Sequence, residues 1–553
     1  MKRYSLNSIG LAIFLNSMTI YALPFNIIPQ GKLPTTVFKG ETVNALYTVT
    51  NNTRTARVKN FVKWLPPNVK QLTDPTDPTV CGSTFDLGPM GSVNQSCTLK
   101  LAVSGEVNRA DPNSEHHLFI CLPGGKTCAG PTPENSLNVT VDNNGPGPTT
   151  ISLAVGGYGT NTTAAPLVYK SSDNGMTWPT AVLPSVTGIS NFQAFLFAVA
   201  CTGKFCTTIG NYFTNTGTVQ PISYSTKDGG ATWSAVNVLS TNGIPAINNY
   251  NQINAASCVG SNCTAVGFSG PANGANPLPL TYSSADYGTT WSQPNLLSIA
   301  ALPASNQGAR LGAVSCSGTN CTAVGFYYDS LGQRQPLSYY STNNGVTWSS
   351  AILQSTTGIP GGYQGGAKLT GISCIGNNCS AVGETPDPAD TSITLPLSYT
   401  STDAGHSWSQ VTILSISGLP VGNKGATLNA VSCVGTQCVA VGLYRNASQE
   451  GAPISYTSSN SGVTWSTVSL LPTNTLPSGF KFGGLLGVSC IGTNCSAVGS
   501  YSDPSNNGFP LAYYSADNGM TWTTALPSIS SIPGALSAAL FSVGGSESGN
   551  LQT

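Results

Sequence analysis

Charged residues are scarce in this chain, and their scarcity excludes several classes of function. Only 8% of the 553 residues are Asp, Glu, Lys or Arg, and 21 basic residues balance 21 acidic ones. A chain without a basic excess is not suited to follow nucleic-acid phosphates or an anionic membrane surface. Charge-driven disorder is excluded too, because 40% of the residues are hydrophobic. We therefore expect a folded protein that binds no nucleic acid.

Histidine and long apolar runs are also nearly absent. Three histidines leave little material for acid–base catalysis or zinc binding, so we expect neither a metal nor another cofactor. After the N-terminus no segment reaches the roughly 18 apolar residues of a membrane helix, and we expect no membrane insertion. An apolar stretch at 9–21 follows Lys2 and Arg3 and precedes Ala22. This pattern predicts a cleaved secretory signal at 1–22; a buried first strand is the alternative.

What the chain has instead is a repeat. The pattern hydroxyl–x–Asp/Asn–x–Gly–x–hydroxyl–Trp occurs seven times, with tryptophans 55 to 60 residues apart. A fixed period of this size is typical of stacked or radially arranged units. The copies are Ser171–Trp178, Thr226–Trp233, Ser284–Trp291, Ser341–Trp348, Ser401–Trp408, Ser458–Trp465 and Ser515–Trp522.

One unit, residues 311–353, shows the expected local structure. A four-residue turn at 317–320 and a variable loop near 328–335 separate short apolar or alternating segments. The segments predict four antiparallel strands, at 312–316, 321–326, 336–340 and 348–353. Four such strands per repeat are typical of a propeller blade. We therefore predict an all-β chain in which residues 150–545 form a seven-bladed β-propeller.

The repeats are out of phase with the ends of this region. Residues 151–156 match a second strand that has no first strand, and residues 536–544 match a first strand with nothing after it. We predict that the two segments pair into one composite blade, which closes the ring and leaves no open sheet edge. Alignment places Ser152 and Ser542 where other blades have cysteines, so this blade is predicted to close without a disulfide.

Cysteine usage favours an exported protein, periplasmic or extracellular. Twelve of the 16 cysteines fall in six Cys-x4-Cys pairs, and we expect each pair to close a hairpin as a disulfide. A metal site would need shorter spacing or a nearby histidine. The pairs are Cys201 with Cys206, Cys258 with Cys263, Cys316 with Cys321, Cys374 with Cys379, Cys433 with Cys438 and Cys490 with Cys495.

The N-terminal part lacks the repeat. Residues 23–142 contain short alternating segments between turn residues, which favours an Ig-like β-sandwich. Its cysteines allow three connectivities, and proximity favours Cys81–Cys97 and Cys121–Cys128. Residues 143–149 have the composition of a linker, and residues 546–553 are a tail.

The repeated motif resembles the Asp-box, or BNR repeat, which sialidases, sortilin-type receptors, certain glucanases and a photosystem assembly factor carry. The resemblance covers about residues 150–545 and implies the propeller fold. It does not carry over a catalytic site, because the boxes of the family lie at the blade periphery, and no Arg-Ile-Pro motif of sialidases stands near the start of the repeats. Asn343 and Asn460 replace the aspartate in two copies. We therefore expect the motif to be a structural turn.

Candidate binding residues concentrate in the loops at the blade end opposite the cysteine turns. Four aromatic residues fall in inter-blade loops, and the repeats hold only three arginines: Phe192, Tyr250, Tyr363 and Phe480, with Arg310, Arg334 and Arg445. Lys368, Lys424 and Lys481 recur near the same position. An aromatic platform of this kind would stack on sugar rings or dock a protein loop. Plain packing of loop aromatics and solvated charge are the alternatives.

These features favour an exported, non-enzymatic binding or adhesion protein that recognises a glycan or a protein through the variable loops. The alternative is a sialidase-like glycoside hydrolase that uses Glu384, Asp387 or Asp390 together with the loop arginines. Two carboxylates within about 10 Å of each other would favour the hydrolase.

Overall fold

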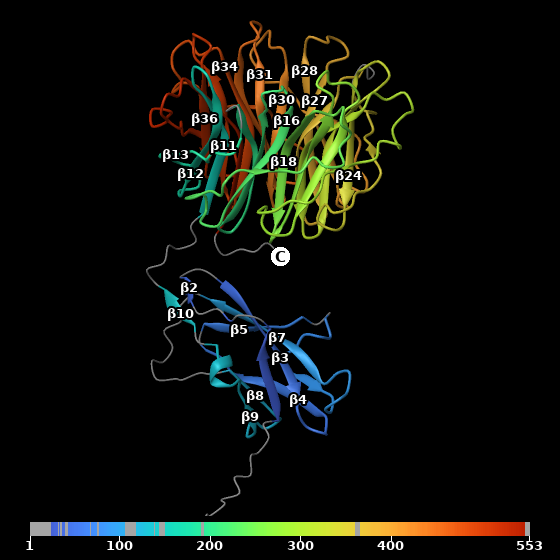
Figure 1. The fold of residues 1–553 in the computed structure, drawn as a ribbon, viewed down its shortest axis with the longest axis vertical. Helices are drawn as coiled ribbons and strands as arrows, with labels where there is room; N and C mark the ends of the chain where they lie inside the picture. Colours follow the sequence, from blue (N-terminus) through green and yellow to red (C-terminus); the bar gives the residue numbers. More distant parts are fainter. Residues whose placement is uncertain are drawn as a thin grey trace, which may run out of the picture. The chain divides into compact units, whose positions relative to one another are not determined.

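The computed structural model describes residues 24–547 except 31–32, 34–35, 39–41, 67, 75–76, 105–117, 138, 143–149, 190–192 and 360–364. The chain separates into two compact units, residues 1–148 and 149–553 (Figure 1). Apart from one 3-10 turn, every regular element in the described residues is a β-strand. The predicted signal at 1–22 and the predicted linker at 143–149 lie outside the described residues.

The first unit contains two four-stranded sheets. Alternate residues of its long strands, such as Leu99, Leu101 and Val103, are fully buried. Its cysteines pair as Cys81–Cys97 and Cys121–Cys128, which confirms the connectivity favoured by proximity. The first sheet has the strand order β1 (Phe25–Pro29), β3 (Thr42–Asn51), β7 (Ser96–Ser104), β5 (Val69–Leu72). The second sheet has the strand order β6 (Phe85–Leu87), β4 (Arg57–Trp64), β8 (Phe119–Cys121), β9 (Cys128–Ala129). Besides these, β2 (Thr36–Phe38) pairs with β10 (Thr140–Asp142), and Pro133–Asn135 form the 3-10 turn.

The second unit is built from four-stranded antiparallel repeats, which we number from the composite one. The first repeat is β38 (Ser537–Glu547), β11 (Thr150–Gly159), β12 (Ala164–Ser171), β13 (Thr180–Val182). The second to fourth are β14 (Ala194–Thr202), β15 (Phe205–Phe213), β16 (Val219–Thr226), β17 (Asn237–Val238); β18 (Tyr250–Val259), β19 (Asn262–Gly270), β20 (Leu278–Ser284), β21 (Asn295–Leu296); β22 (Ala309–Ser317), β23 (Asn320–Tyr328), β24 (Arg334–Ser341), β25 (Ile352–Leu353). The fifth to seventh are β26 (Lys368–Ile375), β27 (Asn378–Pro386), β28 (Thr394–Ser401), β29 (Thr412–Ile413); β30 (Ala426–Val434), β31 (Gln437–Arg445), β32 (Gly451–Ser458), β33 (Ser469–Leu470); β34 (Phe482–Ile491), β35 (Asn494–Ser502), β36 (Gly508–Ser515), β37 (Thr523–Thr524).

The repeats pack side by side through their first strands, and we interpret each repeat as one propeller blade. Every first strand contacts the first strand of the next repeat, and β34 and β14 both contact β38. One position on these strands holds only small residues: Ala198, Ala255, Ala313, Gly371, Ala430, Gly487 and Ser542. A Cβ on Gly371 would lie 2.9 Å from the Cα of Ala430. Larger side chains would therefore force the first strands apart.

The third strands explain why a simple alternation of apolar and polar residues does not appear in the sequence. Leu337, Ser338 and Tyr339 are all fully buried, because neighbouring repeats cover both faces of the sheet. The tyrosine hydroxyl donates to Ser298 O in the preceding repeat at 3.0 Å. An equivalent tyrosine makes this bond in every repeat: Tyr169, Tyr224, Tyr282, Tyr339, Tyr399, Tyr456 and Tyr513.

The cysteine hairpins are tighter than predicted. Ser317 pairs with Asn320, so the turn has two residues rather than four. Gly318 has φ 58°, the positive value that a type II′ turn places at its first central residue. The fourth strand is also shorter than predicted, since ladder pairing is limited to Ile352 and Leu353.

All six disulfides expected from the Cys-x4-Cys spacing are present, so this prediction is confirmed. In each pair the two cysteines face each other across the hairpin, with Cα atoms 4.0 to 4.1 Å apart. Each disulfide therefore joins the first strand of a repeat to its second strand. The bonded pairs are Cys201–Cys206, Cys258–Cys263, Cys316–Cys321, Cys374–Cys379, Cys433–Cys438 and Cys490–Cys495.

The termini of the second unit pair as predicted. Strand β38 runs antiparallel to β11, and in Figure 1 the teal β11 lies beside the red strands from the end of the chain. The alignment of Ser542 with the cysteines was wrong, because Ser152 faces Gly545 whereas Ser542 faces Val155. A Cβ at Gly545 would lie 2.8 Å from Ile151 O and 2.7 Å from Ile491 Cδ1. Crowding at Gly545 therefore disfavours a cysteine there.

Candidate binding site

The repeated Trp motif forms a turn whose polar side chains are occupied by one another. In the fifth repeat Ser401 Oγ donates to Asp403 at 2.8 Å and accepts from Gly405 N at 2.9 Å. Ser407 donates to Asp403 through both its N–H and its hydroxyl. Where asparagine replaces aspartate, the last bond reverses, since Asn343 Nδ2 donates to Thr347 Oγ1 at 2.9 Å. The turn therefore needs no negative charge, as the sequence predicted.

The tryptophans of the motif join neighbouring repeats. Four of the seven donate through Nε1 to a serine on the third strand of the preceding repeat: Trp291 to Ser223, Trp408 to Ser338, Trp465 to Ser398 and Trp522 to Ser455. In two repeats Ala512 or Val168 replaces that serine in the register, and Nε1 of Trp178 or Trp233 is then buried with no hydrogen-bond partner among the residues that the structure describes. The motif thus packs each repeat against the preceding one.

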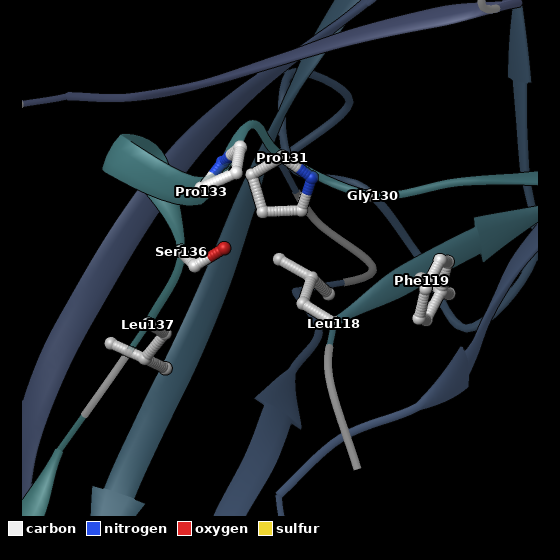
Figure 2. Close-up of a pocket in the computed structure, with 7 residues that line it drawn as sticks. All are labelled: Leu118, Phe119, Gly130, Pro131, Pro133, Ser136 and Leu137. Carbon is white, nitrogen blue, oxygen red and sulfur yellow. The ribbon is translucent and has the colours of Figure 1, made fainter. Parts of the chain in front are cut away.

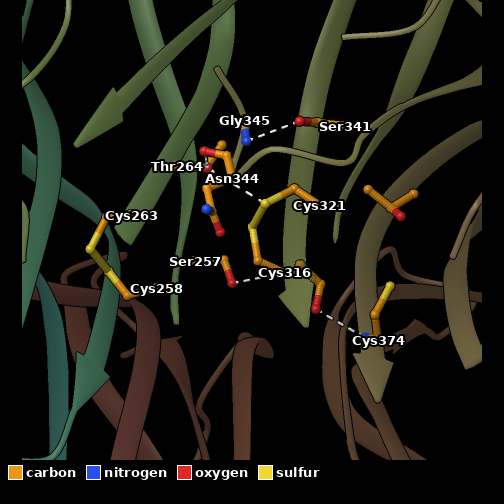
Figure 3. Close-up of a disulfide and its surroundings, with 12 residues drawn as sticks. Ser257, Cys258, Cys263, Thr264, Cys316, Cys321, Ser341, Asn344, Gly345 and Cys374 are labelled. Carbon is orange, nitrogen blue, oxygen red and sulfur yellow. Dashed lines mark hydrogen bonds between the residues drawn. A yellow bond between two sulfur atoms is a disulfide. The ribbon is translucent and has the colours of Figure 1, made fainter. Parts of the chain in front are cut away.

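Polar side chains beside the disulfides also bond to neighbouring repeats (Figure 3). Ser257 Oγ accepts from Cys316 N at 3.0 Å, and Thr264 Oγ1 donates to Asn344 O at 3.0 Å in the motif of the next repeat. Ser315 Oγ accepts from Cys374 N at 2.9 Å, one repeat further on. These groups are engaged in holding the repeats together, which leaves the opposite, loop end of the repeats as the place for a ligand.

A continuous group of aromatic and arginine side chains lies at the loop end of the third and fourth repeats. We call it the Arg310 cluster, comprising Tyr250, Phe268, Arg310, Phe326, Tyr328 and Arg334. The Tyr250 ring stacks on Phe268 with centroids 5.8 Å apart. The Arg310 guanidinium lies over Phe268 at 4.1 Å and near Tyr328 at 5.6 Å. Tyr328 meets Phe326 edge-on at 5.3 Å, and Arg334 lies 5.8 Å from the Phe326 ring.

The cluster is a local departure from the repeat. Arg310 and Phe326 face each other across the first and second strands of the fourth repeat. The equivalent cross-strand pair is Ala539 with Gly157 in the first repeat and Gly484 with Ser500 in the seventh. In the fifth repeat it is Lys368 with Glu384. Charged or aromatic side chains at these two positions occur in the second to fifth repeats, the second holding Phe195 opposite Asn211. The fold does not require them, because Ala, Gly and Ser occupy the same positions in the first and seventh repeats.

The Arg310 guanidinium is short of hydrogen-bond acceptors. Its Nε is buried, and among the described residues it has no hydrogen-bond partner. A buried donor without an acceptor costs free energy, whereas aromatic faces leave the in-plane N–H groups of arginine free for an oxyanion. Asp329 does not serve Arg310, since it accepts from Leu331 N and Gln333 N of its own loop at 2.9 Å. The Arg310 side chain as a whole is half-buried, so the exposed part of its guanidinium can meet an external acceptor.

The predicted binding residues separate into groups. Tyr250, Arg310 and Arg334 come together in the Arg310 cluster, whereas Phe192 and Tyr363 lie outside the described residues. Arg445 lies in the sixth repeat and Phe480 at the start of the seventh, and the Arg445 guanidinium is 5.3 Å from the centre of the Phe482 ring. Tyr250 is the first residue of strand β18 rather than part of a loop.

The predicted lysines are bound to neighbouring polar groups. Lys368 pairs with Glu384 at 3.0 Å, Lys424 donates to Ser392 Oγ at 3.1 Å, and Lys481 donates to Asn506 Oδ1 at 3.4 Å. Each lysine therefore binds a residue of its own repeat or of the preceding repeat.

The carboxyl groups of the hydrolase alternative are engaged by neighbouring groups of the protein. Glu384 forms the ion pair with Lys368. Asp387 accepts from Ala389 N at 2.9 Å, and Asp390 accepts from Ser392 N at 3.0 Å. The hydrogen bond with Ser392 lowers the pKa of Asp390. A general acid for glycoside cleavage needs a raised pKa, so these contacts do not prepare Asp390 for that role.

Two further observations concern other kinds of site. Among the described residues, no group of three or more His, Cys, Asp or Glu side chains is placed to hold a metal ion. No helix in the described part of the chain is long and apolar enough to cross a bilayer. In the first unit a pocket is lined by apolar side chains and one hydroxyl, Ser136 (Figure 2); the lining is Leu118, Phe119, Gly130, Pro131, Pro133, Ser136 and Leu137.

Comparison with known proteins agrees with the motif geometry. The BNR/Asp-box repeat model matches residues 339–350 and 513–524. The chain carries BNR/Asp-box repeats. No curated protein matches the chain. The Asp-box turns therefore identify the class of β-propeller repeat, and the ligand has to be argued from the loop end.

Solved structures similar to this chain include glycan-processing and glycan-binding proteins. A Hadza microbial sialidase is 11% identical with a TM-score of 0.35, covering 81% of this chain and 99% of its own. A Trypanosoma rangeli sialidase is 10% identical with a TM-score of 0.37, covering 63% and 57%. The fucose-specific lectin of Aleuria aurantia is 11% identical with a TM-score of 0.33, covering 60% and 93%. At these TM-scores the similarities carry no argument about activity.

Sequence reasoning missed half of the Arg310 cluster. Phe268, Phe326 and Tyr328 follow the Ala-Val-Gly segment of a second strand, whereas the predicted aromatic residues all came from inter-blade loops. A usable signal was present, because the residue after this glycine is aromatic in two Asp-box repeats and Glu, Leu or Ser in three others.

Proposed function

We propose that the protein is an exported glycan-binding protein and that its Arg310 cluster recognises a glycan carrying a carboxylate or sulfate group. The observation that carries the proposal is the stack of Tyr250, Phe268 and Arg310, in which the buried Nε of Arg310 has no hydrogen-bond partner among the described residues. Aromatic rings offer apolar faces for sugar rings, and arginine binds oxyanions in a bidentate manner.

Export is supported by the disulfides. Eight disulfides join all 16 cysteines, and such density is typical of proteins that fold in an oxidising compartment. Binding without catalysis is supported by the engaged state of Glu384 and Asp390.

A glycan array with paired acidic and neutral glycans tests the proposal. We expect the full-length protein to bind acidic members, and Tyr250→Ala and Arg334→Ala each to weaken that binding about tenfold, the equivalent of about 1.4 kcal/mol. Lys227→Ala is the matched control, since Lys227 is an exposed cation in an Asp-box at the other end of the repeat. Equal binding of neutral partners, or no change in either variant, would contradict the proposal.

A further inference from the structure

The sixth and seventh repeats hold a second arginine–aromatic group at the loop end. We call it the Arg445 cluster, comprising Arg445, Phe480 and Phe482. Arg445 is exposed at the end of β31, with its guanidinium 5.3 Å from the Phe482 ring. Phe480 and Phe482 are each half-buried. Together with Arg310 and Arg334, this means that all three arginines of the repeats lie over an aromatic ring.

The two clusters occupy equivalent places in the repeat. Tyr250 and Phe482 are the first residues of β18 and β34. Each lies three residues before the residue that faces the recurring glycine of the second strand, Ile253 opposite Gly267 and Leu485 opposite Gly499, so the two positions correspond. Each pairs in parallel with the first residue of the preceding third strand, Tyr250 with Val219 and Phe482 with Gly451. The same parallel bridge joins Ala164 to Gln193 and Thr394 to Gly425, so the bridge is a feature of the repeat, and what distinguishes Tyr250 and Phe482 is the aromatic side chain.

One glycine makes room for the second aromatic ring. A Cβ at Gly451 would lie 2.7 Å from Cε2 of Phe482. In the Arg310 cluster the corresponding ring, Tyr250, packs on Phe268 instead. Both clusters place an aromatic ring at this position, and in both a guanidinium lies over an aromatic ring, Phe268 for Arg310 and Phe482 itself for Arg445. Such agreement in outcome points to a shared use of the position rather than to a requirement of the fold.

The Arg445 guanidinium is also available to an external acceptor. Its one hydrogen bond within the described residues runs from Nη1 to Gln449 O at 3.3 Å. Glu450, the nearest carboxylate in the sequence, accepts from Asn446 Nδ2 at 2.9 Å. Arginine has five N–H donors, so most of them remain for a ligand.

We propose that the Arg445 cluster is a second subsite for the same class of acidic glycan, so that one extended chain engages both clusters. This inference rests on the proposed function of the Arg310 cluster. The clusters lie at the same end of the repeats, because both use the beginning of first strands and the end of second strands. Repeat five separates them on one side of the ring. A long anionic polymer then gains affinity from two linked contacts that a short fragment cannot make together.

Chondroitin sulfate, which carries a carboxylate and a sulfate in each repeating disaccharide, provides a probe in two lengths. Its tetrasaccharide and its long chain are measured by calorimetry and by surface plasmon resonance on the immobilised full-length protein. We expect two tetrasaccharides per protein and a long chain bound about a hundredfold more tightly. In Arg445→Ala we expect one tetrasaccharide per protein and loss of the long-chain advantage, with Lys227→Ala behaving as wild type.

The outcomes separate the two proposals. One tetrasaccharide per wild-type protein, lost in Arg334→Ala and unchanged in Arg445→Ala, would overturn the second subsite and leave the proposed function standing. Binding that neither arginine variant alters would overturn both proposals. Absence of binding to either length of the probe would overturn the acidic-glycan assignment, and the second subsite with it.

Discussion

At the Asp-box end of the second unit almost every repeat uses the same residues, whereas at the loop end equivalent positions differ from one repeat to the next. Every repeat has a tyrosine that bonds to the preceding repeat, and six have a hairpin disulfide. At the loop end, the position of Arg310 is taken by Ala539 in the first repeat and Gly484 in the seventh. Residues that hold repeats together cannot vary freely, and residues that do not are available for a ligand. The predictions below test this division, beginning with the largest effect.

Removing a tryptophan from the Asp-box end is expected to have the largest effect. Trp522 is 8% exposed and donates to Ser455 Oγ at 3.1 Å. Trp522→Ala should lower the free energy of unfolding by about 3–5 kcal/mol, because it leaves a cavity between two repeats. Urea denaturation measures this loss, and Met520→Ala, which alters an exposed residue of the same turn, is the control. Glycan affinity of the folded variant should stay within twofold of wild type. A larger loss would contradict the claim that the Asp-box end is structural and the loop end binds the ligand.

Removing one hairpin disulfide should have an intermediate effect. A double variant that combines Cys374→Ser with Cys379→Ser should lower the free energy of unfolding by about 2 kcal/mol, the value that chain entropy gives for a loop this short. Urea denaturation without reductant measures the change. The wild type and the variant should converge when both proteins are fully reduced, because neither then has a disulfide. An unchanged free energy in the variant would show that strand pairing alone holds the hairpin.

Supplying a missing hydrogen-bond partner should stabilise the protein. Nε1 of Trp178 is buried without a partner in the described structure, and the equivalent of the accepting serine is Ala512. Ala512→Ser should raise the free energy of unfolding by about 1 kcal/mol, the net worth of one hydrogen bond. The matched control is Ala497→Ser, a fully buried alanine on the adjacent strand, which should destabilise. Destabilisation by both substitutions would contradict the role assigned to the serine.

The smallest expected effect is a pH dependence. Burial raises the pKa of Asp228, but hydrogen bonds from Thr232 and its neighbours outweigh it and bring the pKa to about 2. An unfolded Asp has a pKa near 3.9, so ionisation stabilises the fold fully above about pH 4, and this contribution is lost as the pH falls toward 2. Asp228→Asn should therefore cost less than about 1 kcal/mol at pH 7 and nothing near pH 2. Asn343→Asp is the reciprocal variant, and urea midpoints across pH 2–7 should show the opposite trend.

Local spacing made most of the framework predictable. The Cys-x4-Cys pairs, the Asp-box turns and the pairing of residues 151–156 with the final strand depend on residues close in sequence or on the phase of the repeat, and all three are present. Strand lengths and turn sizes were less accurate, since cross-strand pairing extends past the apolar residues. Ser542 was placed three residues too early, because the residue opposite Ser152 is Gly545 and no cysteine marks that position in the final strand.

The candidate site was only partly predictable. Tyr250, Arg310 and Arg334 were chosen as separate loop residues, and the sequence contained no indication that Phe268 would lie under Arg310, because these residues belong to different repeats and are 42 positions apart. Arg445 was grouped with them because all three arginines of the repeats were predicted to lie in loops of the same face. The structure assigns it to a different ring, Phe482.

The sequence by itself determined the repeat, its disulfides and its turns, because each depends on contacts between residues a few positions apart. Tertiary structure alone decided which aromatic ring each arginine covers and which serine each tryptophan reaches. Those contacts cross from one repeat to the next, and their geometry follows from the way neighbouring sheets pack, which no local pattern of residues specifies.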